Sequence, residues 1–172
     1  MQKLCSLGVT LIALAASSSL ALHAQPVAAT NAVQVFDRAT NITPLPNGVA
    51  IEDGPLREEI TALRDNIIRI RIGRNGTMPE DASWAVFSEA RHSTVQVTPE
   101  NAADSFGFRT GAVAVQIERN SLRLTIRDLS GKIVQQDALP VRFDGSSFSI
   151  YKTMPLDEHY FGLGDKIGRA HV

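Results

Sequence analysis

The chain of 172 residues contains a single cysteine, Cys5. It lies near the start of an apolar run, Leu4 to Ala16, whereas a lipid-modified cysteine would stand at the end of such a run. Once the first residues are removed, no thiol remains, which excludes disulfides and cysteine-bound zinc from the mature chain. The run is also too short to span a bilayer as a helix.

Metal-binding and nucleic-acid-binding patterns are also missing. The histidines are His23, His92, His159 and His171, and none pairs with another at metal-ligand spacing. Seventeen basic and 18 acidic residues are mixed along the chain without a long basic block. There is no G-x-S-x-G, phosphate-binding loop or H-E-x-x-H motif. We therefore expect no metal, no cofactor and no nucleic-acid partner.

The first residues have the order of a secretory signal peptide: basic Lys3, an apolar run, then small residues. We expect a signal-peptide helix over residues 1–24, with cleavage after Ala24 and cleavage after Ala21 as the alternative. The mature protein would be periplasmic or extracellular, with no membrane contact. Residues 25–47 are rich in Ala, Thr, Asn and Pro and are expected to form a linker with one edge strand, Val33–Phe36.

Beyond residue 47 the hydrophobic period is two, as in β-strands with one buried face. The inward sets are Ile68, Ile70 and Ile72; Val113, Val115 and Ile117; and Leu122, Leu124 and Ile126. Polar side chains alternate with most of them, including Arg69, Arg71, Arg123 and Arg127, which we expect to face solvent. This pattern predicts antiparallel sheets.

Turn residues separate these runs at short intervals: Asn47-Gly48, Asp53-Gly54-Pro55, Asn75-Gly76, Ser130-Gly131 and Asp144-Gly145. A hairpin is expected at Arg119-Asn120-Ser121. Helical turns are expected only over residues 79–82 and 99–104. Many short strands with little helix predict an all-β, antiparallel β-sandwich.

Carboxylates and aromatic residues occur together near the C-terminus. Sugars are commonly bound by carboxylates that accept hydrogen bonds from hydroxyls and by aromatic rings that stack on the pyranose. Tyr160, Phe161 and Asp165 are therefore our candidates for residues close to a carbohydrate. Trp84 could serve as a sugar platform, but the alternation favours a core position. We expect His92 to lie on the surface.

The same segment carries a family resemblance. Residues 160–166, Tyr-Phe-Gly-Leu-Gly-Asp-Lys, resemble the F-Y-G-L-G-E/D-K signature near the end of the N-terminal domain in glycoside hydrolase family 31. Residues 66–72 and 122–134 resemble two strands of that domain. The resemblance covers about residues 48–166.

The resemblance implies a galactose-mutarotase-like β-sandwich over residues 48–166, packed on a (β/α)₈ barrel. It implies a retaining α-glycosidase, acting on α-glucoside or α-xyloside oligosaccharides through two barrel aspartates. A barrel needs about 250 residues, and no Trp-Asp-Met nucleophile motif occurs in this chain. We therefore expect no catalytic residue here, an inactive chain, and poor solubility without the barrel.

Residues 167–172, Ile-Gly-Arg-Ala-His-Val, match one reading frame of a widely used sequencing adapter, ATC GGA AGA GCA CAC GTC. We expect these six residues to be an artefact, although Gly168 also fits the K-x-G pattern of the family.

Two other functions remain open. The chain could be a stand-alone β-sandwich that binds carbohydrate without cleaving it. It could also be an aldose mutarotase, but His92 and His159 lack the sequence context expected for that catalytic set.

Overall fold

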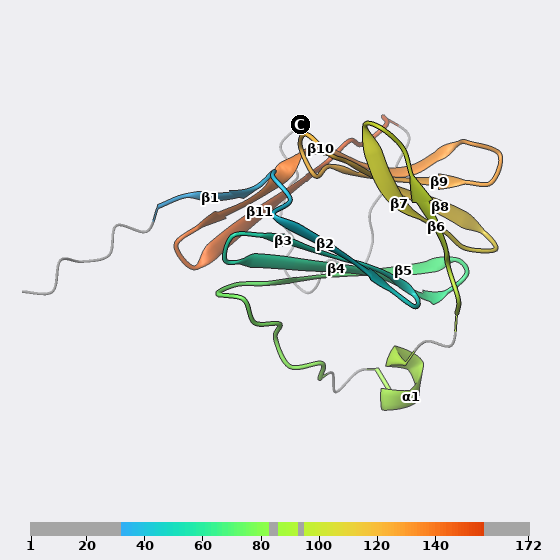
Figure 1. Ribbon diagram of the computed structural model, residues 1–172, viewed down its shortest axis with the longest axis horizontal. Coiled ribbons are helices and arrows are strands. Elements are labelled where there is room, and N and C mark those ends of the chain that lie inside the picture. The colour runs from blue at the N-terminus through green and yellow to red at the C-terminus, as the bar shows by residue number, and fades with distance from the viewer. Residues whose placement is uncertain (1–31, 83–85, 93–94, 157–172) are drawn as a thin grey trace, which may run out of the picture. The chain divides into compact units, whose positions relative to one another are not determined.

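The computed structural model describes residues 32–82, 86–92 and 95–156. The signal peptide, Trp84 and the segment from Asp157 onward lie outside this range. Figure 1 shows the strands in two separate layers. The larger sheet has seven strands: β1 (Gln34–Phe36), β6 (Thr98–Asn101), β7 (Ser105–Arg109), β8 (Val113–Glu118), β9 (Leu124–Asp128), β10 (Ile133–Asp144) and β11 (Ser147–Lys152).

The smaller sheet has four strands in the order of the chain: β2 (Asn41–Leu45), β3 (Gly48–Asp53), β4 (Leu56–Arg64) and β5 (Ile67–Gly73). All strand pairs in both sheets are antiparallel. Helix α1 (Ser88–Arg91) is a single turn. Within the described ranges, no helix has the length and apolar character needed to cross a membrane.

The hydrophobic core lies between the two sheets, which makes the fold a β-sandwich. On strands such as β4 and β8, alternate residues point inward, as the two-residue period requires. The smaller sheet contributes Val49, Ile51, Leu56, Ile60 and Ala62 to a cluster that also includes Phe106, Phe108, Val113, Val115, Ile117, Leu122, Leu124, Ile126, Val141 and Phe143. The all-β sandwich predicted from the alternation is confirmed.

Residues with turn-forming backbone conformations lie where the strands end. Asn75 and Gly76 both have positive φ, 57° and 70°, between the bridged residues Arg74 and Thr77. Two such residues in succession form the type I′ turn for which Asn-Gly is preferred. The hairpin predicted at residues 119–121 also forms, connecting β8 to β9.

Four details differ from the sequence-based expectation. Residues 25–47 contain a second strand, β2, in addition to the edge strand β1. The prediction of a helical turn at residues 99–104 is wrong, because residues 98–101 pair with β7 as an edge strand. Residues 79–82 form no helix, and the one helical turn lies at Ser88–Arg91. Thr125 is buried, although its place between Leu124 and Ile126 assigns it to the outward face by the two-residue period.

Strand β10 positions the site described below. It pairs with β9 near its start, with β1 near its end, and with β11 along its other edge. The register with β11 shifts on both sides of Leu139. Asp137, Val141 and Phe143 are buried, whereas Leu139 is exposed. Register shifts of this kind break the two-residue period, which explains why one leucine faces outward.

Candidate functional site: a charged cavity between the sheets

A cavity of about 360 Å³ opens between the sheets where β4 and β5 face β9, β10 and β11. Three of its lining residues are charged: Glu58 on β4, Asp137 on β10 and Lys152 on β11. The other lining residues are Ile70, Ile72, Leu124, Gln135, Val141, Phe143, Phe148 and Ile150. The cavity therefore combines a largely apolar wall with a small charged cluster.

Glu58 reaches the interior because of its position in β4. Leu56, Glu58, Ile60 and Ala62 alternate on the inward face of this strand, and all four are buried. A glutamate thus occupies a position that the strand otherwise gives to apolar side chains. Glu59, its neighbour, points to the opposite face, where it pairs with Arg57 at 3.1 Å.

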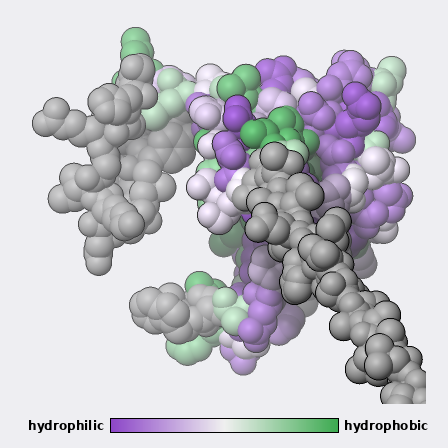
Figure 2. All heavy atoms as spheres, turned by 90° about the vertical axis from the view of Figure 1, so that its left-hand side faces the viewer, coloured by the Kyte–Doolittle hydropathy of each residue, from purple (hydrophilic) through white to green (hydrophobic). Residues whose placement is uncertain are grey.

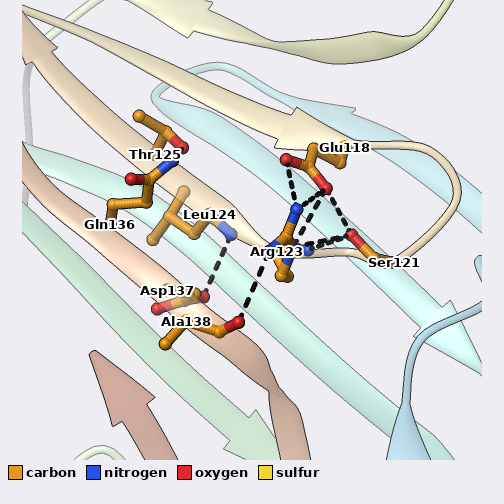
Figure 3. Close-up of polar contacts among 8 residues, drawn as sticks. All are labelled: Glu118, Ser121, Arg123, Leu124, Thr125, Gln136, Asp137 and Ala138. Atoms are coloured by element: carbon orange, nitrogen blue, oxygen red, sulfur yellow. Dashed lines mark hydrogen bonds and ion pairs between the residues drawn. The ribbon is translucent and has the colours of Figure 1, made fainter. Parts of the chain in front are cut away.

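The carboxylate of Asp137 is held by two donors. The backbone N–H of Leu124 donates to its Oδ2 atom over 3.0 Å, as Figure 3 shows. The Lys152 ammonium group donates to its Oδ1 atom. Asp137 is only 7% exposed, so both contacts lie in a largely desolvated environment. Charge-assisted hydrogen bonds of this kind satisfy the two oxygens of the carboxylate.

Glu58 has no comparable partners. It is 5% exposed, and no hydrogen bond or ion pair is formed by its carboxyl group with the described part of the chain. Burial raises the pKa of Glu58 from its ordinary value of 4.5 to about 8; the negative charge of Asp137 adds to this rise and Lys152 opposes it. The group therefore holds its proton at neutral pH.

Chemically, the cavity contains a protonated carboxyl group beside a carboxylate paired with a lysine. Such an arrangement can donate a proton, accept a hydrogen bond or take up a cation. Among the residues that the structure describes, no cluster of three or more His, Cys, Asp or Glu side chains could hold a metal ion.

A second polar cluster stabilises the turn between β8 and β9. Arg123 donates three hydrogen bonds to Glu118: from Nη2 to Oε1 over 3.0 Å, from Nη2 to Oε2 over 2.9 Å, and from Nε to Oε2 over 3.0 Å. The Ser121 hydroxyl donates to Oε2 over 2.6 Å, and this bond, followed by the contacts of Arg123, lowers the pKa of Glu118. Arg123 also donates to the Ala138 carbonyl on β10 (Figure 3). We assign this cluster a structural role, because its donors are all directed at groups of the protein itself.

The outward face of the larger sheet is also polar. A groove of about 470 Å³ is lined by Asn101, Ser105, Arg109, Gln116 and Arg127, among others. These side chains interact with their neighbours: Gln116 donates to Ser105 over 3.0 Å, and Arg109 pairs with Glu100 at 2.8 Å. The groove has the character of a solvated sheet face.

Three arginines of the smaller sheet, Arg57, Arg69 and Arg71, are paired with acidic groups. Arg69 forms two hydrogen bonds with Asp81, which lower the pKa of Asp81 to about 2, and Arg71 lies 3.8 Å from Glu59. This agrees with the expectation of a solvated face. Paired arginines offer little free charge to a polyanion.

The sequence-based candidates Tyr160, Phe161 and Asp165 lie outside the described residues, so their relation to the cavity stays a prediction. His92 is exposed, as expected. The sequence reasoning missed Glu58, Asp137 and Lys152. For Glu58 a signal existed, since the alternation of Leu56, Ile60 and Ala62 places a charged residue on an apolar face. Asp137 carried a similar signal, because it alternates with Leu139, Val141 and Phe143 in the sequence.

Comparison with solved structures shows that the fold is shared with much larger proteins. The chain matches a dextranase of glycoside hydrolase family 31 from Flavobacterium johnsoniae, solved with glucose, at 20% identity and a TM-score of 0.68. The match covers 78% of this chain and 17% of the dextranase. A mutant of the same dextranase complexed with isomaltotriose matches equally well.

An uncharacterised protein of Listeria monocytogenes, solved with glucose, matches at 11% identity and a TM-score of 0.50, over 67% of this chain and 11% of that one. No curated protein sequence matches the chain significantly. Residues 58–171, more than half of the chain, match the model of the glycosyl hydrolase 31 N-terminal galactose mutarotase-like domain. The chain therefore belongs to glycoside hydrolase family 31, through the N-terminal β-sandwich domain of that family.

Proposed function

We propose that this chain is the non-catalytic N-terminal part of a retaining α-glycosidase that acts on α-glucosidic or α-xylosidic bonds. In this proposal, catalysis takes place on a (β/α)₈ barrel elsewhere in the same polypeptide. The main support is the family match over residues 58–171, together with the 17% share of the dextranase that the chain covers. The dextranase was solved with glucose, which supports a carbohydrate substrate class.

The carboxyl groups of the cavity do not suit retaining hydrolysis. A retaining mechanism needs two carboxyl groups on opposite sides of the scissile bond, one of which attacks the sugar as a nucleophile. Asp137 is buried and both of its oxygens are engaged by Leu124 and Lys152. This supports the expectation that the catalytic pair belongs to another part of the protein.

Exposed apolar side chains on β10 and β11 support the presence of a large partner surface. Leu139, Phe148, Ile150 and Tyr151 are all exposed, and Phe148 retains 65% of its accessible surface. Figure 2, which views the side where the β10–β11 hairpin turns in Figure 1, shows hydrophobic surface next to hydrophilic surface. Large exposed apolar side chains commonly mark an interface, and we assign those of β10 and β11 to contact with the barrel.

The proposal includes export from the cytoplasm to the periplasm or the medium, an expectation that rests on residues 1–24. It also includes cleavage of that segment before the domain reaches its final location.

The purified chain is expected to show no glycosidase activity. Its turnover of nitrophenyl α-glucoside and α-xyloside should equal that of buffer, because the nucleophile and the acid/base residue are supplied by the barrel. The positive control is the full-length product of the parent locus, assayed at the same molar concentration. Turnover by the chain alone would overturn the assignment of catalysis to another domain.

The purified chain is also expected to self-associate as its concentration rises, because the apolar surface of β10 and β11 is left uncovered. Size-exclusion chromatography with light scattering at several concentrations measures this. Replacing Phe148 and Ile150 with serine should reduce the association, whereas replacing the outward-facing Gln116 with serine on the other face should not. A monomer at every concentration would count against a bare barrel interface.

A further inference from the structure

The charges in the inter-sheet cavity balance only while Glu58 keeps its proton. Its charged lining residues are two carboxyl groups and one ammonium group. Lys152 is committed to Asp137, whose second oxygen accepts the Leu124 N–H. Glu58 is left with a buried carboxyl group that accepts no hydrogen bond from the described part of the chain. The cavity thus has room for one more cationic donor.

A buried carboxyl group of this kind requires an explanation. Most buried polar groups in folded proteins have a hydrogen-bond partner. The carboxyl group of Glu58 has none among the described residues, and its oxygens keep only slight contact with solvent through the cavity. An apolar residue at position 58 would continue the inward face formed by Leu56, Ile60 and Ala62. The glutamate therefore points to a partner that comes from outside this set of residues.

The lining and volume of the cavity indicate the apolar character and the size of the partner. Ile70 and Ile72 form one side, and Phe143, Phe148 and Ile150 form another. Phe148 and Ile150 are also exposed, so the cavity is reached from solvent past their side chains. Its volume of about 360 Å³ lies at the lower end of the range of about 300–1,000 Å³ for small-molecule sites.

We propose that this cavity binds a small organic cation, a primary ammonium group on a short apolar stem, with the ammonium group donating to Glu58 and the stem lying against the isoleucine and phenylalanine walls. An anion would face two carboxyl groups. A metal ion would lack the third His, Cys, Asp or Glu ligand within the described residues. A neutral apolar molecule would leave Glu58 without a donor. The site uses no residue assigned to a sugar, but Phe148 and Ile150 at its mouth also belong to the surface that we assign to the barrel. The proposal therefore concerns the chain without the barrel, which is the form tested below.

The site should respond to pH in a defined direction. The titratable groups that face Glu58 are Asp137 on β10 and Lys152 on β11, while β5 and β9 contribute only Ile70, Ile72 and Leu124. An ammonium group favours the ionised form of Glu58, and this form becomes dominant only above about pH 8. A primary amine stays protonated there, as lysine does. Affinity should therefore rise by up to about tenfold per pH unit between pH 6 and pH 8.

The test is a titration of the full chain with n-hexylamine at pH 8. Isothermal titration calorimetry measures the affinity, and NMR chemical-shift changes show which residues respond. Hexan-1-ol and hexanoate provide neutral and anionic probes of the same length, and methylamine provides the cation without the stem. We expect saturable binding of n-hexylamine, binding of hexan-1-ol at least tenfold weaker, and no binding of hexanoate or methylamine.

Two substitutions at adjacent positions make the test specific. Glu58→Gln should weaken n-hexylamine binding by at least tenfold and remove its dependence on pH, whereas Glu59→Gln should change neither. Circular dichroism confirms that both variants are folded. Equal binding of n-hexylamine and hexan-1-ol, unchanged binding by Glu58→Gln, or no saturable binding of n-hexylamine would each overturn the proposal. Binding of a lysine-containing peptide without binding of n-hexylamine would also overturn it, in favour of a protein partner.

Discussion

Replacing Glu58 with glutamine should make the chain more stable at neutral pH, by about 3 kcal/mol at pH 7 and about 5 kcal/mol above pH 8. The substitution keeps the shape of the side chain and removes its charge. Its effect follows from the pKa of Glu58, which burial raises from 4.5 to about 8. Few single substitutions at a buried charged position are expected to stabilise a protein this strongly.

The direction of the effect is set by proton binding. Between pH 4.5 and pH 8 the folded chain keeps a proton on Glu58 that the unfolded chain has lost. The free energy of unfolding therefore falls as the pH rises, by about 1.4 kcal/mol per pH unit over this window. Below about pH 4.5 both states are protonated and the contribution is fully present. Glutamine does not titrate, so its variant avoids the loss.

Urea unfolding of the parent chain and the variant at pH 4.5, 6, 7 and 8.5 measures this difference. The matched control is Glu59→Gln, which alters the outward face of the same strand. It loses ion pairs with Arg57 and Arg71 that are partly exposed, and each such pair is worth about 0–1 kcal/mol. A Glu58→Gln variant that is less stable than the parent at pH 7, or whose advantage does not grow with pH, would show that Glu58 is not a buried proton-holding group.

Replacing Lys152 with methionine should destabilise the chain by about 3 kcal/mol, because it leaves the buried Asp137 carboxylate without its cation. Methionine keeps most of the volume of the lysine stem, so packing in the cavity changes little. The Leu124 N–H still donates to one oxygen of Asp137, but no other cation lines the described cavity. Two carboxyl groups then face each other with no positive charge between them.

The control for this variant is Arg142→Met. Arg142 lies on the same strand as Asp137 and pairs with Asp144 at 3.8 Å, with both side chains more than half exposed. An exposed pair of this kind contributes about 0–1 kcal/mol. Chemical denaturation at pH 7 should therefore separate the two methionine variants clearly. Similar losses for both would mean that the Lys152–Asp137 pair is no more important than a surface ion pair.

Much of the fold could be predicted because simple alternation determines it. Val113, Val115 and Ile117 are buried on β8, with Ala114 and Gln116 on the other face, as a period of two requires. Asn75-Gly76 forms the expected tight turn because its conformation depends only on the backbone preferences of these two residues. The family resemblance was carried by residues 160–166, and it is confirmed by the match over residues 58–171.

The features that escaped prediction depend on contacts between distant strands. Residues 98–101 form an edge strand because β7 offers them a pairing partner. Leu122 was expected to begin a strand, but it lies in the β8–β9 turn with a φ of 51°, and it is buried there all the same. The cavity joins Glu58 to Asp137 and Lys152 across the two sheets, a juxtaposition that no local pattern in the chain encodes.

The most direct test of the assignment to a larger α-glycosidase is a long-read sequence of the parent locus. If the chain is the N-terminal domain of such an enzyme, the reading frame continues beyond Lys166 into a (β/α)₈ barrel that carries a nucleophilic aspartate. The codons for residues 167–172 would then differ from the adapter sequence. A genome that encodes the same six residues followed by a stop codon would contradict the assignment and leave a stand-alone β-sandwich.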